Sequence, residues 1–363
     1  MFDFCIIGGG ASGMYASILL AKKGYSVAVL EANSRVGKKL LATGNGKCNL
    51  SNTIINAECY NTPIAFSVVK NFDMQKQMLE LGLVTKVKTG RVYPFSEQAN
   101  NVLNIMLCNM QKYSVKVITD CLAQEIKIND CVTIKTSKGE FCCKKVCLAT
   151  GSKASFGIDS LHLYEKLGHS VVKNNPALVP LIAKKPEQIK GLNGVRQEAQ
   201  VSLYDNGKLI ATEFGEVQFR KDGISGIVIL NMSSKMCRYN MESGVCYLDF
   251  MPEFTSLQVE ELLKNDITAE FGVLNKNLMQ NAIKYGANGI KKYKIDVVKS
   301  MDEKLSQVMN GGLSVNEFDF DKMQSKINNN LYAIGEALNV DGICGGYNLL
   351  FAFASSYNFA KEF

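Results

Sequence analysis

A glycine-rich turn between an apolar strand and a helix constrains this chain more than any other feature. Residues 3–7 (Asp-Phe-Cys-Ile-Ile) are predicted to form a buried strand, and Met14 to Lys23 a helix that ends at Gly24. Between them the spacing Gly8-x-Gly10-x-x-Gly13 is that of a dinucleotide-binding turn. A second apolar strand, Ser26 to Leu30, completes a βαβ unit, and such units build parallel sheets.

The end of the second strand carries the acidic residue that this type of site requires. Glu31 lies 18 residues after Gly13, where a carboxylate can bind the ribose hydroxyls of the nucleotide. The start of the helix offers free N–H groups and the positive end of its dipole to the pyrophosphate. A carboxylate at this place favours a free 2′-hydroxyl and excludes NADP from this site.

The choice between FAD and NAD depends on the rest of the chain. The sequence holds one such fingerprint, and further glycine turns occur at Thr43–Asn49, at Ala149-Thr150-Gly151 and at Gly335-Glu336. Turns spread this widely suit a long ligand such as FAD. With no second dinucleotide fingerprint, NAD(P)H is expected to visit the flavin transiently.

Length and composition bound the remaining possibilities. The chain has 363 residues, which suggests two to three domains, and 47% of them are hydrophobic. The longest apolar stretch is interrupted by glycines, so we expect no transmembrane helix, no export signal and a cytoplasmic location. The twelve cysteines include no Cys-x-x-Cys pair, so we expect free thiols and no metal site. The net charge of +7 fits an anionic ligand without requiring one.

The order of elements predicts a domain that opens and closes the chain, with an insertion between its halves. We predict a Rossmann-like α/β domain in residues 1–175 and 325–363. Residues 176–252 and 311–324 are predicted to form an inserted, mostly β domain because turn signals separate short apolar runs. Residues 253–310 are rich in helix formers, including Val297 to Met309, and are predicted to form a small helical domain.

Several motifs resemble one family over residues 3 to about 360. The chain is similar to the BaiN/RdsA-type NAD(P)/FAD-dependent oxidoreductases, also described as aminoacetone-oxidase-like flavoproteins. Thr43-Gly44-Asn45-Gly46-Lys47-Cys48-Asn49 and Cys344-Gly345-Gly346-Tyr347-Asn348 are the most specific matches. Gly90-Arg91-Val92-Tyr93-Pro94 matches more weakly, and Ser152 stands where the family usually has a glycine.

The resemblance implies a flavoprotein of the two-dinucleotide-binding type with inserted barrel-like and helical domains. It implies FAD as the cofactor and an oxidoreductase acting on a small molecule, with NAD(P)H or O₂ as redox partner. The turns and the resemblance together define the candidate cofactor-binding residues: Gly8, Gly10, Ala11, Ser12, Gly13, Glu31, Ala32, Lys38, Lys39, Asn45, Gly46, Cys48, Asn49, Leu122, Thr150, Gly151, Gly335, Glu336, Asp341, Gly345, Gly346, Tyr347 and Asn348.

Residues that could carry chemistry are fewer. Cys48 is the candidate catalytic residue, because a thiol beside the flavin could give a proton to a substrate carbon. The alternative, which we favour, is a small packing residue whose backbone lies against the ring. Arg91 and Tyr93 are candidate substrate contacts, with a structural role at a strand edge as the alternative.

Three functions remain open from the sequence. The first is an FAD-dependent oxidoreductase of a small molecule, either an NAD(P)H-dependent reductase of a C=C, C=N or C=O bond or an enzyme of the amine oxidase type. The second, implied by the family, is reduction of uridine to dihydrouridine in ribosomal RNA, for which Lys291-Lys292-Tyr293-Lys294 is a candidate contact. The third is a flavin-binding protein without turnover. The sequence specifies neither the substrate nor the oligomeric state.

Overall fold

The computed structural model describes residues 1–154, 158–265 and 272–363. The chain forms two compact units: unit 1 comprises Met1–Asn174 with Val308–Phe363, and unit 2 comprises Asn175–Gln307. Within the predicted domains, residues 155–157 and 266–271 lie outside the described residues. Within the described ranges, none of the helices has both the length and the apolar character that a membrane crossing requires.

Unit 1 is built on a sheet whose central five strands are parallel. Their order across the sheet is β20-β9-β1-β2-β6. The bounds of these strands are β1 Phe2–Ile7, β2 Val27–Leu30, β6 Lys116–Ile118, β9 Gly139–Leu148 and β20 Leu331–Ala333. All four residues of β2 are buried, as a parallel strand covered on both faces requires.

Antiparallel strands extend this sheet, and a smaller sheet lies apart from it. β7 (Ala123–Ile128) and β8 (Val132–Thr136) join through β9, while β18 (Phe318–Asp319) and β19 (Gln324–Ser325) lie beside β20. The three-stranded small sheet has the order β3-β5-β4, with bounds β3 Ser51–Asn52, β4 Thr85–Lys88 and β5 Arg91–Pro94. β10 (Val171–Ala177) pairs with β17 (Val308–Leu313).

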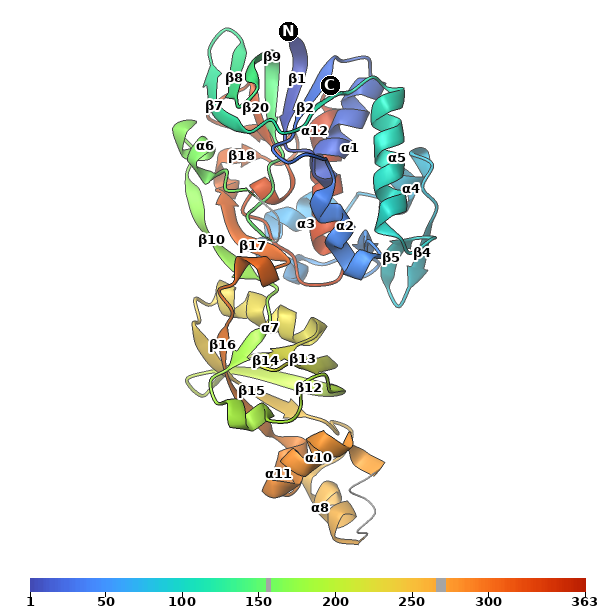
Figure 1. Cartoon of the computed structure of the whole chain (residues 1–363), viewed down its shortest axis with the longest axis vertical. Coiled ribbons are helices and arrows are strands. Elements are labelled where there is room, and N and C mark those ends of the chain that lie inside the picture. Colours follow the sequence, from blue (N-terminus) through green and yellow to red (C-terminus); the bar gives the residue numbers. More distant parts are fainter. Residues whose placement is uncertain (155–157, 266–271) are drawn as a thin grey trace. The chain divides into compact units, whose positions relative to one another are not determined.

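Two long helices form the core of unit 1 together with the sheet. Figure 1 shows α1 (Ala11–Lys22) and α12 (Tyr347–Lys361) side by side, although they come from opposite ends of the chain. Tyr15 of α1 and Phe353 of α12 meet edge to face with ring centroids 5.3 Å apart. The other helices of this unit are α2 Lys38–Ala42, α3 Pro63–Val69, α4 Met74–Glu80, α5 Ala99–Lys112 and α6 Leu161–Lys166.

Unit 2 contains a closed barrel with the strand order β11-β14-β13-β12-β15-β16. The strands are β11 Leu181–Ala183, β12 Arg196–Asp205, β13 Lys208–Phe219, β14 Gly223–Ser225, β15 Ser243–Asp249 and β16 Tyr293–Lys299. Among its described residues, the α-helices are α7 Ile227–Arg238, α8 Ser256–Asn265, α10 Lys276–Ala282 and α11 Ala287–Lys291.

Two of the predicted ranges are wrong at their boundaries. The stretch Val297 to Met309 is not helical, because it contains the end of β16 and the start of β17. Tyr293, Ile295 and Val297 are buried at every second position, which is the period of a strand. Residues 311–324 belong to unit 1 rather than to the inserted β domain, since β18 and β19 extend its sheet. The predicted mostly β region also contains the helix α7.

Candidate cofactor site

The candidate cofactor-binding residues gather at the carboxyl edge of the parallel sheet. Ile7 lies opposite Leu30 and Leu148, Leu30 lies opposite Ile118, and Leu148 lies opposite Ala333, so the five strands end in line. The residues that follow these ends are Gly8, Glu31, Leu122, Thr150 and Gly335. Ligands of open α/β sheets bind outside these ends. Turns far apart in the sequence therefore share one edge.

The first turn is packed tightly on one side and open on the other. A Cβ atom at Gly8 would lie 2.3 Å from the carbonyl oxygen of Ala149, and one at Gly13 would lie 1.9 Å from that of Gly8. At Gly10, by contrast, a Cβ atom would meet no described atom within 4 Å. Gly10 directly precedes Ala11 and Ser12, the first residues of α1. The open side of the turn therefore lies at a helix N-terminus, which suits a pyrophosphate.

Glu31 is buried and rigidly oriented. Its side chain is 8% exposed, and its carboxylate accepts hydrogen bonds from Gly9 N (2.7 Å), Asn33 N (2.7 Å) and Asn33 Nδ2 (2.8 Å). Oε1 accepts both bonds from Asn33, whereas Oε2 accepts one from Gly9 and can accept a second, so the side chain can also bind a ribose hydroxyl. The backbone N–H of Cys121 donates to the carbonyl of Glu31 (2.9 Å), which keeps the neighbouring Leu122 at this place. Ala32 follows Glu31 directly.

Lys39 and Glu336 bind one another. The two side chains form an ion pair (Nζ–Oε2, 3.5 Å). Lys39 Nζ donates to the carbonyl of Ser152 (2.6 Å), and the Ser152 hydroxyl donates to Glu336 Oε1 (2.7 Å). This network joins the turn at Gly151 to the turn after β20, so part of the charge of Lys39 is compensated by the protein. Lys38 instead lies near Asn33, with Nζ 3.4 Å from Oδ1.

The Thr43–Asn49 loop is held in an unusual backbone conformation. Gly44, Asn45, Gly46 and Cys48 have φ angles of 56°, 53°, 81° and 56°. Asn45 and Cys48 are therefore in the left-handed region, which costs energy for residues other than glycine. Backbone strain of this kind persists mainly at binding and catalytic sites.

Cys48 is fully buried within this loop. It is 0% exposed, and burial raises the pKa of its thiol to about 11, with a hydrogen bond to the Thr43 side chain acting in the opposite direction. The group is therefore a neutral thiol at pH 7 rather than a thiolate nucleophile. A buried neutral thiol fits the packing role, and a proton-donor role stays a prediction.

Asn49 supplies an observation that favours a bound ligand. Among the described residues, its buried side-chain oxygen Oδ1 has no hydrogen-bond partner. A buried acceptor without a donor is costly, and an N–H group of a ligand would satisfy it. The loop also contacts residues 344–348, which we call the C-terminal motif. A Cβ at Gly346 would lie 2.9 Å from this oxygen and 2.6 Å from Ser51 O. With the open side at Gly10, these residues fit a long dinucleotide.

The C-terminal motif uses its side chains to shape its own loop. Asn348 Oδ1 accepts from Gly342 N (2.8 Å) and Asn348 Nδ2 donates to Gly342 O (2.9 Å). The Tyr347 hydroxyl donates to Ile54 O (2.9 Å), and buried Asp341 accepts from Asn310 Nδ2 (2.8 Å). Each of these side chains therefore has a partner within the protein, and cofactor binding by these residues stays a prediction. The N–H groups at the start of α12, after Gly345 and Gly346, are what the motif offers a ligand.

The candidate substrate residues lie next to this motif. Arg91 and Tyr93 lie on β5, and Arg91 pairs with Asn52 of β3. Asn52 Nδ2 donates to Gly345 O (3.1 Å), which connects the small sheet to the C-terminal motif. Neither Asn52 nor Ser152 was identified as a site residue from the sequence, because a single polar residue carries no local signal of such a contact.

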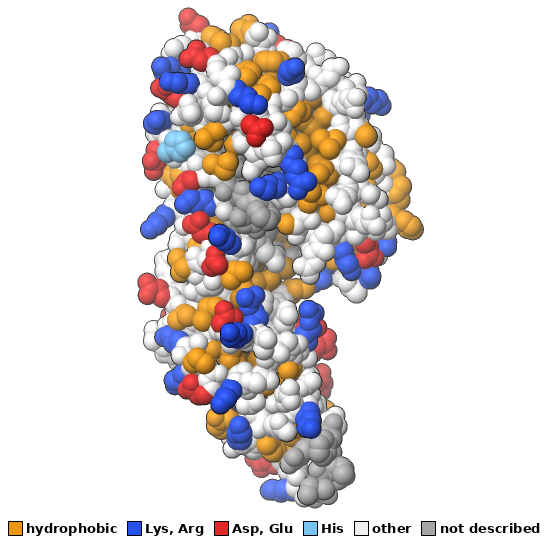
Figure 2. Space-filling view, viewed as in Figure 1, with side chains coloured by type: hydrophobic (Ala, Val, Ile, Leu, Met, Phe, Trp, Pro, Cys, Tyr) orange, Lys and Arg blue, Asp and Glu red, His pale blue; other side chains and the backbone are white. Residues whose placement is uncertain are grey.

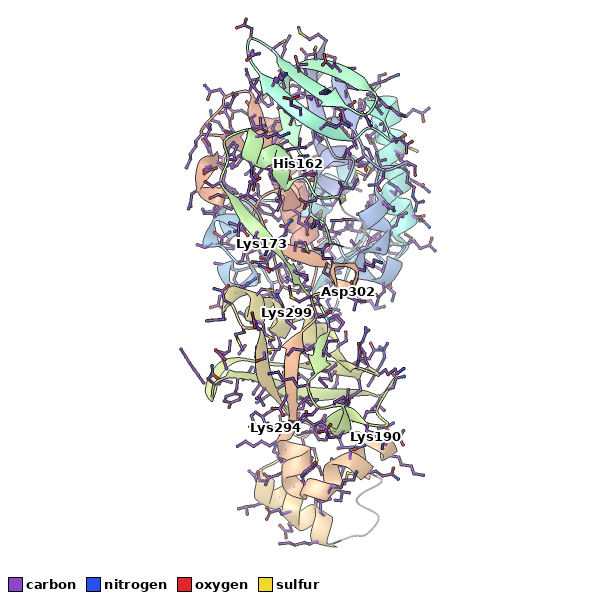
Figure 3. The ribbon with its side chains drawn as sticks, turned by 60° about the vertical axis from the view of Figure 1, so that its left-hand side comes forward. His162, Lys173, Lys190, Lys294, Lys299 and Asp302 are labelled. Carbon is purple, nitrogen blue, oxygen red and sulfur yellow. The ribbon has the colours of Figure 1, made fainter. Side chains whose placement is uncertain are left out.

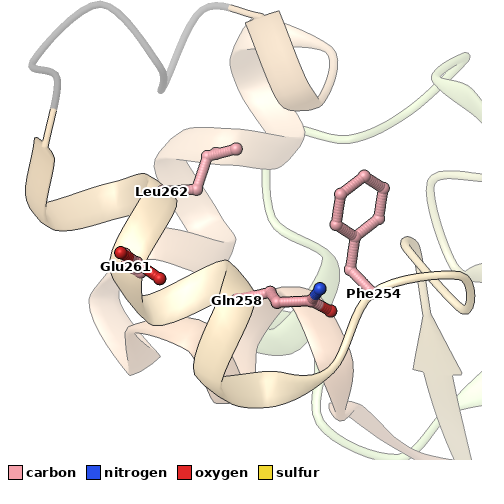
Figure 4. A pocket seen from close by; sticks show the side chains of 4 residues that line it. All are labelled: Phe254, Gln258, Glu261 and Leu262. Atoms are coloured by element: carbon pink, nitrogen blue, oxygen red, sulfur yellow. The ribbon is translucent and has the colours of Figure 1, made fainter.

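A separate hollow lies beside α8 in unit 2. It is lined by Phe254, Gln258, Glu261 and Leu262, as Figure 4 shows. None of these residues belongs to a motif found in the sequence, and the hollow carries no assignment.

Comparison with known proteins shows the family. The sequence profile described as "HI0933-like protein Rossmann domain" matches residues 2–362. The chain is 32% identical to the 3-dehydro-bile acid delta(4,6)-reductase of Clostridium scindens, covering 97% of this chain and 96% of that relative. It is 25% identical to the ribosomal RNA dihydrouridine synthase of Escherichia coli, covering 99% and 98%. The chain therefore belongs to the HI0933-like Rossmann family.

A solved structure agrees with this fold. The 3-ketosteroid-delta4-(5alpha)-dehydrogenase of Rhodococcus jostii RHA1 is similar, with a TM-score of 0.50 and 14% identity, covering 99% of this chain and 96% of that chain. Together these findings confirm the predicted family, the α/β flavoprotein fold and the enzyme class, an FAD-dependent oxidoreductase.

Proposed function

We propose that this protein is a reductase that takes hydride from NAD(P)H and passes it to a C=C, C=N or C=O bond of a small molecule. With O₂ as the redox partner, the electrons would run the other way, from the small molecule through the flavin to O₂. The relative of Clostridium scindens, a named reductase that matches nearly the whole chain, supports this choice. The single observation that carries it is the alignment of five strand ends, which brings Gly8, Glu31, Leu122, Thr150 and Gly335 to one edge.

The residues divide the work of holding the cofactor. Bound FAD supplies the hydride chemistry. The turn before α1 would hold the pyrophosphate, and Glu31 would bind the ribose through charge-assisted hydrogen bonds. The N-terminus of α12 would stabilise negative charge at the ring through its dipole. Buried Asn49 would accept a hydrogen bond from the ring, while the Asn45–Cys48 backbone lies against it.

The experiment is purification followed by identification of the bound flavin. We expect yellow protein that releases FAD, not FMN, on denaturation, and whose flavin is bleached anaerobically by NADH or NADPH. A 3-oxo-4-ene bile acid is the first substrate to test, by following reoxidation of the flavin without O₂. Colourless protein that cannot be reconstituted with FAD would contradict the proposal. The anaerobic bleaching tests NAD(P)H as the donor, and a cytoplasmic location is a separate part of the proposal.

Reduction of uridine in ribosomal RNA is the second candidate, because the Escherichia coli relative has that activity. The basic cluster that sequence analysis associated with RNA does not favour it. Lys291 Nζ pairs with Asp249 (2.7 Å), Lys294 Nζ pairs with Asp296 (3.2 Å), and Tyr293 is buried; Figure 3 labels Lys294. The test is the dihydrouridine content of ribosomal RNA after deletion of the gene. Loss of this nucleoside would favour the second candidate over the first.

A further inference from the structure

The small sheet of unit 1 presents its basic residues on a single face. Directly opposite residues of antiparallel strands share a face. Arg91 lies opposite both Asn52 and Lys88, and Tyr93 lies opposite Lys86. The other face is buried at Ser51 and Val92, which are 2% and 4% exposed, and is exposed at Val87 on the edge strand β4. We call the first face the basic face; it consists of Asn52, Lys86, Lys88, Arg91 and Tyr93.

The basic face adjoins the loops proposed to hold FAD. Asn52 Nδ2 donates to Gly345 O (3.1 Å), and the Tyr347 hydroxyl donates to Ile54 O (2.9 Å). Burial raises the pKa of the Tyr347 phenol, and the positive charge of Arg91 acts in the opposite direction. The guanidinium is therefore close enough to act on the first residue of α12.

Positive charge exceeds negative charge at this place. The Glu97 carboxylate forms ion pairs with three lysines. The Nζ–Oε distance is 2.9 Å for Lys86 and 3.4 Å for both Lys47 and Lys88. These lysines, Lys86 first, lower the pKa of Glu97 to about 2. Arg91, directly opposite Lys88, adds a fourth positive charge to this region. Figure 2 shows blue side chains around a red one where Figure 1 labels β4 and β5. Lys47 belongs to the Thr43–Asn49 loop, so the excess of positive charge lies next to the candidate cofactor site.

Within the basic face, Lys86 and Lys88 pair with Glu97, whereas Arg91 can bind an acceptor from outside the protein. Its side chain is half-buried, and no hydrogen bond or ion pair engages its guanidinium within the part of the chain that the structure describes. A half-buried guanidinium without an acceptor is unfavourable, and its planar donors match a carboxylate or a phosphate. An anionic group bound here would satisfy it.

We propose that Arg91, supported by Lys86 and Lys88, binds an anionic group of the molecule that reacts at the cofactor. This inference rests on the proposed function. The shared chemistry is a carboxylate or phosphate oxygen, and it has two possible sources: an acidic small-molecule substrate or the phosphates of NAD(P)H. Tyr93, on the same face, would contact the uncharged body of that molecule.

The experiment compares Arg91→Gln with a matched control, Lys135→Gln. Lys135 is exposed on β8 and its loss changes the net charge equally. Both FAD-loaded proteins are titrated by equilibrium dialysis with NADPH, with a 3-oxo-4-ene bile acid, and with the methyl ester of that acid. Arg91→Gln is expected to weaken binding of one anionic probe by about 10- to 100-fold, the effect of a lost charged hydrogen-bond pair. Lys135→Gln is expected to bind as the wild type does.

The probes separate the sources. Weaker binding of NADPH alone assigns the site to the dinucleotide phosphates, and weaker binding of the acid but not the ester assigns it to the substrate carboxylate. Arg91→Lys should recover part of the loss, because it keeps the charge without the planar donors. Equal binding of all three probes by Arg91→Gln and Lys135→Gln overturns the inference. The FAD content of the wild type reports separately on the proposed function.

Discussion

Two glycine-rich segments of the cofactor site obtain their shapes for different reasons. In the turn of residues 8–13, Gly8 and Gly13 are required by neighbouring backbone, which a Cβ would approach to 2.3 and 1.9 Å. In the Thr43–Asn49 loop, Gly46 would meet no described atom within 4 Å, and it is the φ angle of 81° that favours glycine there. The first segment is fixed by the packing of the protein. In the second, a Cβ at Gly44 would lie 2.9 Å from Asn49 N, a contact within the loop itself, and the strained φ angles of Asn45 and Cys48 are those expected for a loop shaped around a ligand.

The largest expected effect tests the first half of this comparison. Gly13→Ala forces a Cβ against the Gly8 carbonyl, and we expect a loss of at least about 3 kcal/mol in the free energy of unfolding. Gly10→Ala is the matched control, because its φ of −77° suits alanine and its surroundings are open. Urea unfolding should leave Gly10→Ala close to the wild type, while its FAD affinity falls because the methyl group occupies the pyrophosphate side. Equal stability of the two variants would contradict the packing argument.

Glu31 tests whether the packed turn also binds ligand. Glu31→Lys removes an acceptor that holds Gly9 and Asn33 and that would bind ribose. We expect the dissociation constant for FAD to rise by about 100-fold or more. Glu140→Lys, at an exposed position of β9, makes the same change of charge and should leave the constant nearly unaltered. Flavin retained after dilution and ultrafiltration measures both. Similar retention by the two variants would show that only net charge matters.

The same contrast explains how much could be predicted from the sequence. The βαβ unit was predictable because strand, turn, helix and Glu31 are local signals within 31 residues. The position of β16 was not, because Tyr293 to Lys299 follows helix formers and gains its strand partners from β11 and β15, more than 40 residues away. Tertiary pairing overrode local propensity there.

Individual contacts were the least predictable part. The amide of Asn348, a predicted cofactor-binding residue, also holds Gly342, a contact that its motif did not indicate. Asn52, which reaches Gly345, carried no signal in the sequence. Ser152 departs from the family pattern and bridges Lys39 and Glu336. A motif indicates that such residues share a site. Which polar atom contacts which is decided by side-chain geometry that the pattern does not encode.

Cys48 allows a smaller test of the second segment. Its folded-state pKa of about 11 lies above the ordinary value of 9.0 because the thiolate is poorly solvated. The neutral thiol therefore contributes stability that is complete below pH 9 and is lost as the pH rises towards 11. Other buried groups also titrate, so the quantity to measure is the difference in the free energy of unfolding between the wild type and Cys48→Ser. Between pH 8 and pH 10, the free energy of unfolding of the wild type should fall by about 1.4 kcal/mol relative to that of Cys48→Ser. An unchanged difference would show that the thiol is solvated.

The smallest expected effect concerns turnover, where Cys48 separates a packed loop from a catalytic one. If Cys48 only fills space, Cys48→Ser should bind FAD slightly less well and keep nearly all of its substrate reduction. If Cys48 gives a proton, the variant should still be reduced by NAD(P)H but lose substrate reduction by about 10²–10⁴-fold. Stopped-flow absorbance follows the two half-reactions separately. We expect the packing outcome, because a thiol that is 0% exposed with a pKa of about 11 is a poor acid, and a small side chain suits close approach of the loop to a flat ring. A selective loss in the second half-reaction would make Cys48 catalytic and would extend the role of the strained loop from binding to chemistry.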